Sequence, residues 1–398
     1  MKRIWILAIL SGILAVAAVH IAVFTLEESG GVDKIKVGYI YVGDACNAYT
    51  KNFMHAQDAI LLEYGDRVEN IPKYNVSEGS EEKILQELIA EGCDLIFGTS
   101  YGYGPTFRKY AELYPEVEFC MATGDNANDG GVLPNYHCFM GEIYEGRYIS
   151  GVVAGMKLLE LIENGEITED EAVVGYVAAY PYAEVISGYT AFYLGIASVV
   201  PEVSMLVSYS DSWGDYSTEY EIAEKLIDMG CVIISQHSDT AGPAVACEEA
   251  SAEHTVFHIG YNQSMSDVAP TTSIISCRIN WQKYMLSAVK AVLNGKEIES
   301  VVEGNVHGRD VSGGFKEGWL QMLKLNEVIA APGTAEKIEE LIGQFEREQV
   351  EVFRGDYTGV DPFDSTDTYD LSKGFTENEH QSSPEFHYVL QDVITIVE

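Results

Sequence analysis

Seven short segments of the chain are rich in aromatic, carboxylate, amide and hydroxyl side chains, and each follows an apolar run. They are residues 41–50, 98–104, 122–129, 178–185, 209–217, 235–242 and 260–264. Aromatic rings can stack on a planar ligand, while carboxylates and amides can bond its polar edge. A planar heterocycle would use this set, and a sugar would accept a similar one. The segments therefore predict a site for a small polar ligand and leave these two classes open.

Nine side chains in these segments are candidate ligand contacts. They are Asp44, Asn47, Tyr49, Tyr101, Trp213, Asp215, His237, Asp239 and Tyr261. Asp44 and Asp215 could equally cap the helices that follow them, because Asp is favoured at helix N-termini. His237 closes a predicted strand and suits a structural role as well as a ligand contact. Trp213 lies between small residues in a polar loop, which favours a binding role.

Patterns that would indicate catalysis or a bound metal are absent from the sequence. It lacks the motifs of nucleophilic hydrolases, zinc peptidases and phosphate-binding loops, and no nucleophile stands beside an evident base. The seven cysteines form no C-x-x-C pair, and most lie in apolar runs where cysteine behaves as a small hydrophobe. We therefore expect a binding protein rather than an enzyme, with no cofactor and no metal.

The charge balance narrows the class of partner. The 398 residues include 24 Lys and Arg against 62 Asp and Glu, a formal net charge of -38. Such a surface repels phosphate backbones, so we expect no nucleic-acid partner. A neutral or cationic small ligand fits this charge better than an anionic one.

Residues 1–26 predict an export signal or an N-terminal membrane anchor. A positive start, Met1-Lys2-Arg3, precedes an uncharged apolar run to Leu26, which is long enough to cross a bilayer at about 20 residues. Ala15-Val16-Ala17 is a possible cleavage site. Acidic residues follow at once in a linker at 27–34, so the bulk of the chain is expected outside the membrane.

From residue 35 onward, apolar strand-like runs alternate with amphipathic helix-length segments, which predicts parallel α/β sheets. The segments "LIAEGCDLIFGTS" (88–100) and "LIDMGCVIISQHS" (226–238) make the same helix-to-strand transition twice. We interpret this as two similar lobes facing a cleft, since ligands of open α/β sheets bind beyond the carboxyl ends of the strands. A long helix over 142–163 carries small residues at 150, 151, 154 and 155.

The sequence suggests four parts after the linker. Lobe 1 is expected over 35–140 and lobe 2 over 141–268, with residues 269–334, including the strand "TSIISC", crossing back to lobe 1. Residues 335–398 form an acidic C-terminal extension, and we expect its segment 355–386 to be surface loop.

Several longer stretches resemble the basic membrane protein family, the extracytoplasmic receptors of ABC importers for purine nucleosides or nucleobases. They are "YGPTFRKYAELYPEVEFCMATG", "YEGRYISGVVAGM", "YVAAYPYAEVISGYTAFYLGI" and "SDSWGDYSTEYEIAEKLIDMGCVIISQHSD". The resemblance spans roughly residues 35–330 and implies a type I periplasmic-binding-protein fold, with two Rossmann-like lobes joined by a hinge.

The resemblance also implies roles for single residues. Asp44 corresponds to the aspartate after the family's first strand, and Trp213 to an aromatic that stacks on the purine, with Asp215 beyond it. The aromatic on the other side of the purine is Tyr49, Phe53 or Tyr101.

The chain departs from the family pattern at three places. Thr123 and the segment 260–264 stand where nucleoside receptors carry aspartates suited to ribose, which favours a free base. No cysteine precedes Cys46, so a lipid anchor is unsupported and an uncleaved N-terminal helix is the expected tether.

These features together favour an extracytoplasmic solute-binding protein that captures a purine nucleobase or nucleoside and delivers it to the permease of an ABC importer. Two alternatives stay open at this point. One is a membrane-tethered ligand sensor of the same fold, and the other is a nucleoside-processing enzyme.

Overall fold

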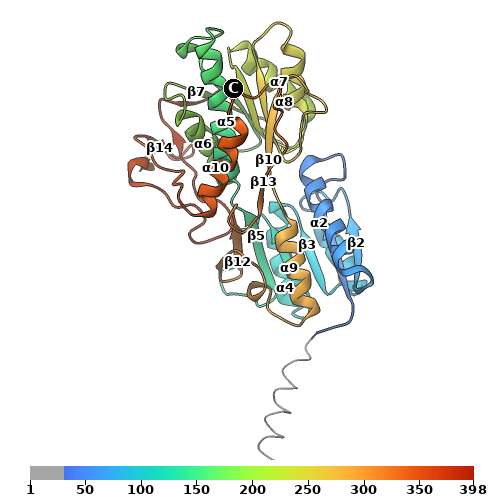
Figure 1. The fold of residues 1–398 in the computed structure, drawn as a ribbon. Coiled ribbons are helices and arrows are strands. Elements are labelled where there is room, and N and C mark those ends of the chain that lie inside the picture. Colours follow the sequence, from blue (N-terminus) through green and yellow to red (C-terminus); the bar gives the residue numbers. More distant parts are fainter. Residues whose placement is uncertain (1–30) are drawn as a thin grey trace, which may run out of the picture.

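The computed structural model of the protein describes residues 31–398, which form two α/β lobes one above the other (Figure 1). The predicted export signal or anchor, and the first half of the predicted linker, lie outside these residues. Within residues 31–398, no helix combines the length and the apolar character needed to cross a membrane.

In the described residues, the sheet of the first lobe has the strand order β11-β12-β5-β4-β3-β1-β2. The strands are parallel except at one edge, where β11 pairs antiparallel with β12. Their bounds are β1 Ile35–Ile40, β2 Val68–Lys73, β3 Leu95–Gly98, β4 Glu118–Ala122, β5 Tyr136–Gly141, β11 Asn305–His307 and β12 Asp310–Gly313. The helices are α2 Ala48–Tyr64, α3 Glu81–Ala90, α4 Gly104–Leu113 and α9 Gln282–Leu293.

The sheet of the second lobe repeats this plan, in the order β13-β10-β9-β8-β6-β7-β17. Only β13 is antiparallel, paired with β10. The strands are β6 Val173–Ala178, β7 Ser204–Tyr209, β8 Ile233–His237, β9 Phe257–Tyr261, β10 Ser273–Ile279, β13 Leu320–Met322 and β17 Ile394–Ile396. The helices are α5 Tyr144–Glu163, α6 Ala183–Ala197, α7 Tyr216–Asp228 and α8 Gly242–Ala250.

The repeated sequence transition has the same structural role in both lobes. Gly92 after α3 and Gly230 after α7 both adopt the left-handed conformation, with φ of 79° and 92°, which glycine accepts without strain. The strands that follow, β3 and β8, lie beside the first strand of their own sheets. Both strands therefore end at the same place in their lobe, where ligands of such sheets bind.

Within residues 31–398, the chain crosses between the two sheets and their helices three times: between β5 and α5, between β10 and α9, and between β12 and β13. The segment 269–334, expected to return to lobe 1, is therefore shared. Strands β10 and β13 belong to the second sheet, whereas α9, β11 and β12 belong to the first lobe. The apolar sequence of β10 shows a buried strand but not which sheet it joins, because that depends on backbone pairing with β9.

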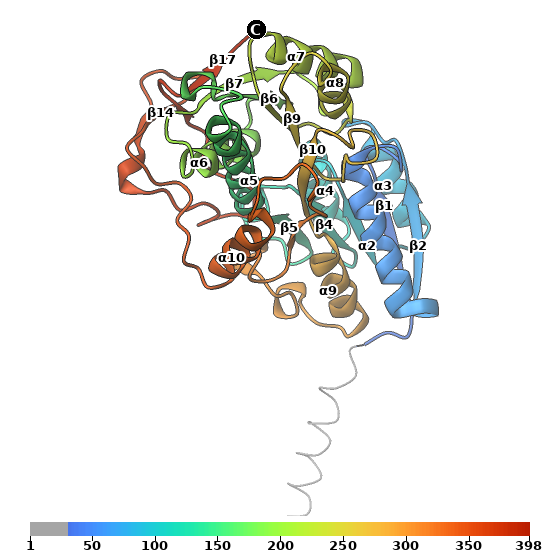
Figure 2. The ribbon, with the colours of Figure 1, turned by 45° about the horizontal axis from the view of Figure 1, so that its top comes forward.

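The C-terminal extension begins with α10 Thr334–Glu346, where the sequence favours an acidic helix over 335–348. The segment 355–386, expected to be surface loop, instead contributes β14 Thr358–Val360 and β15 Thr368–Asp370 to a small sheet with β16 Val389–Leu390. The last strand of the extension, β17, joins the second sheet beside β7 (Figure 2). Within 355–386, several side chains are buried, among them Glu377, Ser382, Ser383 and Phe386. The polar composition of this segment predicts exposure to solvent. Polar side chains can nevertheless be buried when hydrogen bonds satisfy them, as they do here.

The small residues of the predicted long helix allow α5 and α6 to pack closely. A side-chain carbon built on Gly151 of α5 would overlap the backbone oxygen of Phe192, and one on Gly195 of α6 would overlap that of Tyr148. The two helix backbones therefore touch at these glycines. The nearest atoms at both glycines belong to the backbone of the facing helix, so a new side chain could not be accommodated by a rotamer change.

We expect Gly195→Ala to lower the free energy of unfolding by about 1–3 kcal/mol, because the added methyl forces the helices apart. Urea denaturation would measure this change. The matched control is Gly343→Ala in α10, where the new carbon would meet only the mobile guanidinium of Arg347 at 3.2 Å. That variant should be neutral or slightly more stable, since Ala is the better helix former. Equal stability of Gly195→Ala and the wild type would contradict the packing argument.

Candidate ligand-binding site

A cavity of about 250 Å³ lies between the lobes, at the carboxyl ends of strands from both sheets. We refer to it as the inter-lobe cavity. Its lining residues are Val42, Asn47, Tyr49, Thr99, Ser100, Tyr101, Thr123, Glu184, Trp213, Gly214, Asp239 and Tyr261. Six of the nine side chains predicted from the sequence are in this set: Asn47, Tyr49, Tyr101, Trp213, Asp239 and Tyr261.

The first lobe contributes two tyrosines whose hydroxyls are held in place. Tyr49 lies in the first turn of α2, and its hydroxyl donates to the backbone oxygen of Thr99 at 2.7 Å. Tyr101 follows β3, and its hydroxyl donates to Oδ2 of Asp125 at 2.8 Å. Because the hydroxyls are occupied, the rings are oriented and present apolar faces or edges to the cavity.

Phe53, the third aromatic suggested for this lobe, does not line the cavity. It is fully buried and stacks on Trp281, with ring centroids 4.4 Å apart. Its position one helical turn beyond Tyr49 directs it into the core between α2 and α9.

The second lobe contributes Trp213 and Tyr261. Trp213 lies in the loop between β7 and α7, where its backbone oxygen accepts from the amide of Asp239 at 2.8 Å. Its ring packs edge-on against Tyr180 at a centroid separation of 5.6 Å. Tyr261 ends β9, and the guanidinium of Arg147 lies 3.8 Å from its ring centroid. Each lobe thus places aromatic side chains on the inter-lobe cavity.

Asn47 and Asp239 provide polar groups on opposite sides of the cleft. Asn47 caps α2, with its side-chain oxygen accepting from the amide of Thr50 at 2.7 Å. Oδ1 of Asp239 accepts from the side chain of Asn262 at 3.0 Å. Burial raises the pKa of Asp239 to about 8, and the charges of Glu219 and Glu184 add to this effect. Asp239 is therefore mostly protonated at neutral pH and can donate a hydrogen bond as well as accept one.

Three of the predicted residues lie outside the cavity lining. Asp215 caps α7, accepting from the amide of Thr218 at 3.1 Å, which is the alternative role considered from the sequence. Asp44 accepts from the amide of Cys46 at 2.9 Å and lines a neighbouring groove. These hydrogen bonds lower the pKa of both carboxyls.

His237, the third, is fully buried behind the cavity wall, with its ring 4.8 Å from that of Tyr261. Burial, together with the charge of Arg147, lowers the pKa of His237 to about 4, so its imidazole is neutral. Nε2 of His237 lies 3.5 Å from a carboxylate oxygen of Glu184. The histidine thus supports the tyrosine and the glutamate that line the cavity.

Sequence reasoning missed Glu184 and Arg147. Glu184 lies in the first turn of α6, within a segment already singled out, and its charge was the available signal. Arg147 is fully buried in α5, and Nη1 donates to the backbone oxygen of Gln236 at 2.8 Å. Its signal was the single arginine of a helix whose other residues are mostly apolar or small. An arginine so placed fixes the ring of Tyr261 by a cation–π contact.

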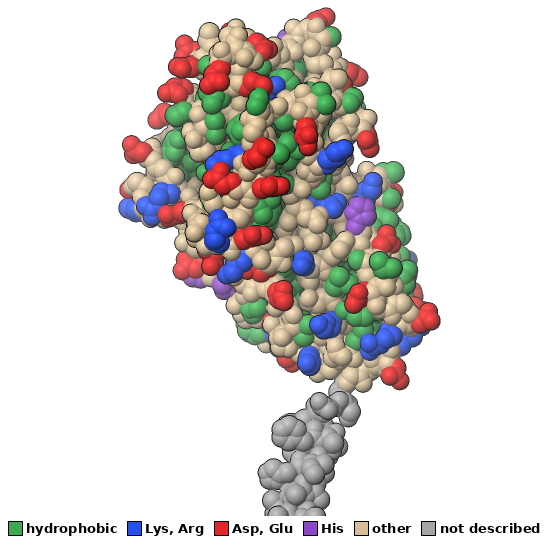
Figure 3. All heavy atoms as spheres, viewed as in Figure 1, with side chains coloured by type: hydrophobic (Ala, Val, Ile, Leu, Met, Phe, Trp, Pro, Cys, Tyr) green, Lys and Arg blue, Asp and Glu red, His purple; other side chains and the backbone are tan. Residues whose placement is uncertain are grey.

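Carboxyl groups dominate the electrostatics around the cleft. Behind Asp239, Glu219 is buried and accepts from the hydroxyls of Ser238 at 2.8 Å and Thr240 at 2.6 Å. Burial raises the pKa of Glu219 to about 7. On the outer surface, Figure 3 shows lysine and arginine side chains interspersed with carboxylates. The cleft therefore suits a ligand that is neutral or cationic and rich in donors.

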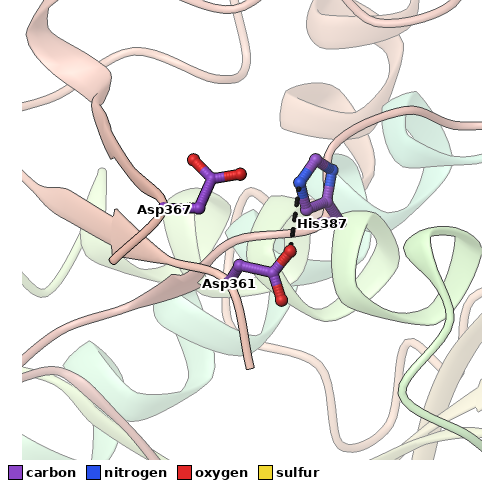
Figure 4. A group of neighbouring side chains, drawn as sticks. All are labelled: Asp361, Asp367 and His387. Carbon is purple, nitrogen blue, oxygen red and sulfur yellow. Dashed lines mark ion pairs between the residues drawn. The ribbon is translucent and has the colours of Figure 1, made fainter. Parts of the chain in front are cut away.

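A separate group of metal-binding side-chain types lies in the C-terminal extension. Asp361, Asp367 and His387 point toward one another, with Nε2 of His387 3.5 Å from Oδ2 of Asp361 (Figure 4). Asp367 is exposed, and none of the three lines the inter-lobe cavity. We assign no ion to this group.

Two parallel-sheet lobes, joined by three crossings around an aromatic cavity, define the class of two-lobed solute-binding proteins. The chain matches the family described as ABC transporter substrate-binding protein PnrA-like (Bmp) over residues 37–349, and it belongs to that family. The predicted fold class and family are thereby confirmed. Proteins of this family serve transport from an extracytoplasmic location and are not enzymes, so the alternative of a nucleoside-processing enzyme is set aside.

Individual relatives are consistent with this family. A purine-binding protein of Brucella abortus is 30% identical over 292 residues, covering 73% of this chain and 75% of that protein. A putative ABC transporter glucose-binding protein of Haloferax volcanii is 32% identical over 243 residues, covering 61% of this chain and 55% of that protein. A solute-binding protein of an Aeropyrum pernix ABC transporter shares the fold, with a TM-score of 0.64 at 18% identity and coverage of 83% and 95%.

The raised pKa of Asp239 predicts how the stability of the folded protein depends on pH. A carboxyl whose folded-state pKa lies above its unfolded value binds a proton more tightly when folded, so its contribution is lost as pH rises from about 4 to about 8. Asp239→Asn cannot ionise. We expect its melting temperature to exceed that of the wild type at about pH 8.5 and to change little at about pH 5.

Thermal denaturation of the unliganded proteins at both pH values would measure the effect. The control is Asp215→Asn, because the pKa of this exposed cap is lowered and asparagine also caps helices well. This variant should gain no stability at high pH. A pH-independent difference between Asp239→Asn and wild type would contradict the burial of an ionisable group at this position.

Proposed function

We propose that this protein captures a purine nucleobase or nucleoside outside the membrane and delivers it to the permease of an ABC importer. An uncleaved N-terminal helix would tether the protein to the membrane. The observation that carries this proposal is that both lobes place aromatic side chains on one cavity. These are Tyr49 and Tyr101 from the first lobe and Trp213 and Tyr261 from the second. The Brucella relative named as purine-binding supports the choice of ligand.

The cavity offers a purine two kinds of contact. Stacking of a base on an aromatic ring is worth about 1–3 kcal/mol in single-stranded nucleic-acid sites, which present the same chemistry. Asn47, Glu184 and Asp239 supply donors and acceptors for the edge of the ring system. A volume of about 250 Å³ is at the small end of ligand pockets, which fits a compact planar molecule.

Contacts between side chains of the two lobes link ligand capture to lobe closure. The side chain of Asn52 in α2 donates to Oδ1 of Asn262 at 3.1 Å and accepts from Gln263 at 2.6 Å. Tyr101 and Tyr182, from opposite lobes, have ring centroids 6.3 Å apart. A ligand that contacts both lobes binds the closed form more tightly than the open form. This difference in affinity shifts the equilibrium toward the closed form. A permease that recognises the closed form would then receive loaded protein.

Glucose is the competing ligand, because the Haloferax relative is named as a putative glucose-binding protein. Sugars also stack on aromatic rings and bond carboxylates, so the lining accepts their chemistry. Titration calorimetry with adenine, guanine, their nucleosides and glucose would distinguish the two classes. Binding of glucose without binding of any purine would overturn the proposal while leaving the family assignment intact.

Removing the aromatic stack should weaken purine binding. We expect Trp213→Ala to raise the Kd for the purine ligand about 5- to 150-fold, the equivalent of one lost stack, and Trp213→Phe to retain most of the affinity. Calorimetric titration would give both constants. The control is Phe363→Ala, which alters a 78% exposed aromatic of the C-terminal extension. Unchanged affinity in Trp213→Ala would show that the ligand does not stack on this ring.

A further inference from the structure

The C-terminal extension reaches the ligand cleft, although the family match ends at residue 349. A second cavity of about 480 Å³ adjoins the inter-lobe cavity and shares four of its lining residues, Tyr101, Thr123, Glu184 and Trp213. Its remaining wall includes Gln381, Ser383, Pro384 and Glu385 of the extension. We refer to residues 381–385 as the C-terminal wall.

Hydrogen bonds to the first lobe fix the C-terminal wall at the end of β4. The amide of Ser382 donates to Oδ1 of Asp310 at 2.9 Å, and the hydroxyl of Ser383 donates to the backbone oxygen of Gly124 at 2.9 Å. Both serines are buried. The end of β4 is one of the strand ends where ligands of this fold bind, so the C-terminal wall stands at the site itself.

A second set of contacts holds the wall from within the extension. The buried carboxylate of Glu377 accepts from the amides of Glu385 at 2.9 Å and Phe386 at 3.0 Å. Asn378 donates to the backbone oxygen of Ser382 at 2.6 Å. Because these backbone groups are paired, the loop has a defined shape and can present side chains at fixed positions.

The side chains that the C-terminal wall presents are polar and available. Among the described residues, the amide of Gln381 and the carboxylate of Glu385 have no side-chain hydrogen bond, and both residues line the second cavity. Asp125 lines the same cavity, and its Oδ2 accepts from the hydroxyl of Tyr101 at 2.8 Å. Two carboxylates and an amide facing one cavity suit a group that carries several hydroxyls.

We propose that the C-terminal wall binds a hydroxyl-bearing group attached to the planar part of the ligand, so that the protein prefers a nucleoside to a free base. This inference rests on the proposed purine-binding function. The planar part occupies the inter-lobe cavity, and the sugar extends past Tyr101 and Trp213 into the second cavity. Asp125 and Glu385 replace the ribose-binding carboxylates whose absence at Thr123 and in 260–264 favoured a free base from the sequence.

Paired titrations of base and nucleoside test the proposal. Calorimetry on the full chain, purified in mild detergent, would measure the Kd for adenine, adenosine, guanine and guanosine. We expect the wild type to bind each nucleoside about tenfold or more tightly than its base, since a hydrogen bond to a charged group contributes about 1.5–3 kcal/mol. The double variant Gln381→Ala/Glu385→Ala should lose this preference while its affinity for the base stays unchanged.

The matched control is Thr376→Ala/Glu379→Ala, which removes one hydroxyl and one carboxylate from exposed positions of the same extension. It should keep the wild-type preference. Equal binding of base and nucleoside by the wild type would overturn the C-terminal wall as a sugar site but leave the purine proposal standing. The same conclusion would follow if the double variant kept the nucleoside preference, or if it weakened base and nucleoside equally. Absence of binding by all four purines would overturn both proposals together.

Discussion

The ligand site depends on the three chain crossings that hold two parallel sheets with their carboxyl ends toward one gap. In each crossing the chain leaves one sheet and enters the other lobe, so the three crossings keep the two lobes adjacent. At the crossings, a side-chain carbon on Gly141 would lie 2.8 Å from Ile279, which shows how closely these strands pass. Because the strand ends face one another, loops distant in sequence become walls of one cavity.

The cavity combines apolar rings with Asp239, a carboxyl whose pKa is raised by burial. Burial raises the pKa of Asp239 and of Glu219 behind it, and the charge of Glu219 adds to the effect on Asp239. Tyr261 is held by Arg147 and the neutral His237 from behind. A protonated carboxyl both donates and accepts hydrogen bonds. An acidic protein can therefore use such a group to bind the ligand without adding a negative charge to the site.

The C-terminal extension adds strands and a cleft-lining loop beyond residue 349, where the match to the family ends. Its strand β17 pairs with β7 of the second lobe, and Ser382 bonds Asp310 of the first lobe. The extension therefore contacts both lobes and borders the cleft between them. Since residues 350–398 lie outside the family match, ligand preference in this chain can differ from that of relatives that share the remainder of the fold.

The sequence alone determined the alternating strands and helices of the two lobes and the α/β class, because hydrophobic periodicity and glycine stops act over a few neighbouring residues. It also indicated six of the twelve residues that line the cavity, since parallel strands of known order must end at one edge. Only the tertiary structure decided that β10 belongs to the second sheet, that Phe53 faces the core, and that His237 stands behind the wall. It alone brought residues 381–385 to the cleft. Those outcomes depend on pairing and packing between segments far apart in the chain, which no local pattern encodes.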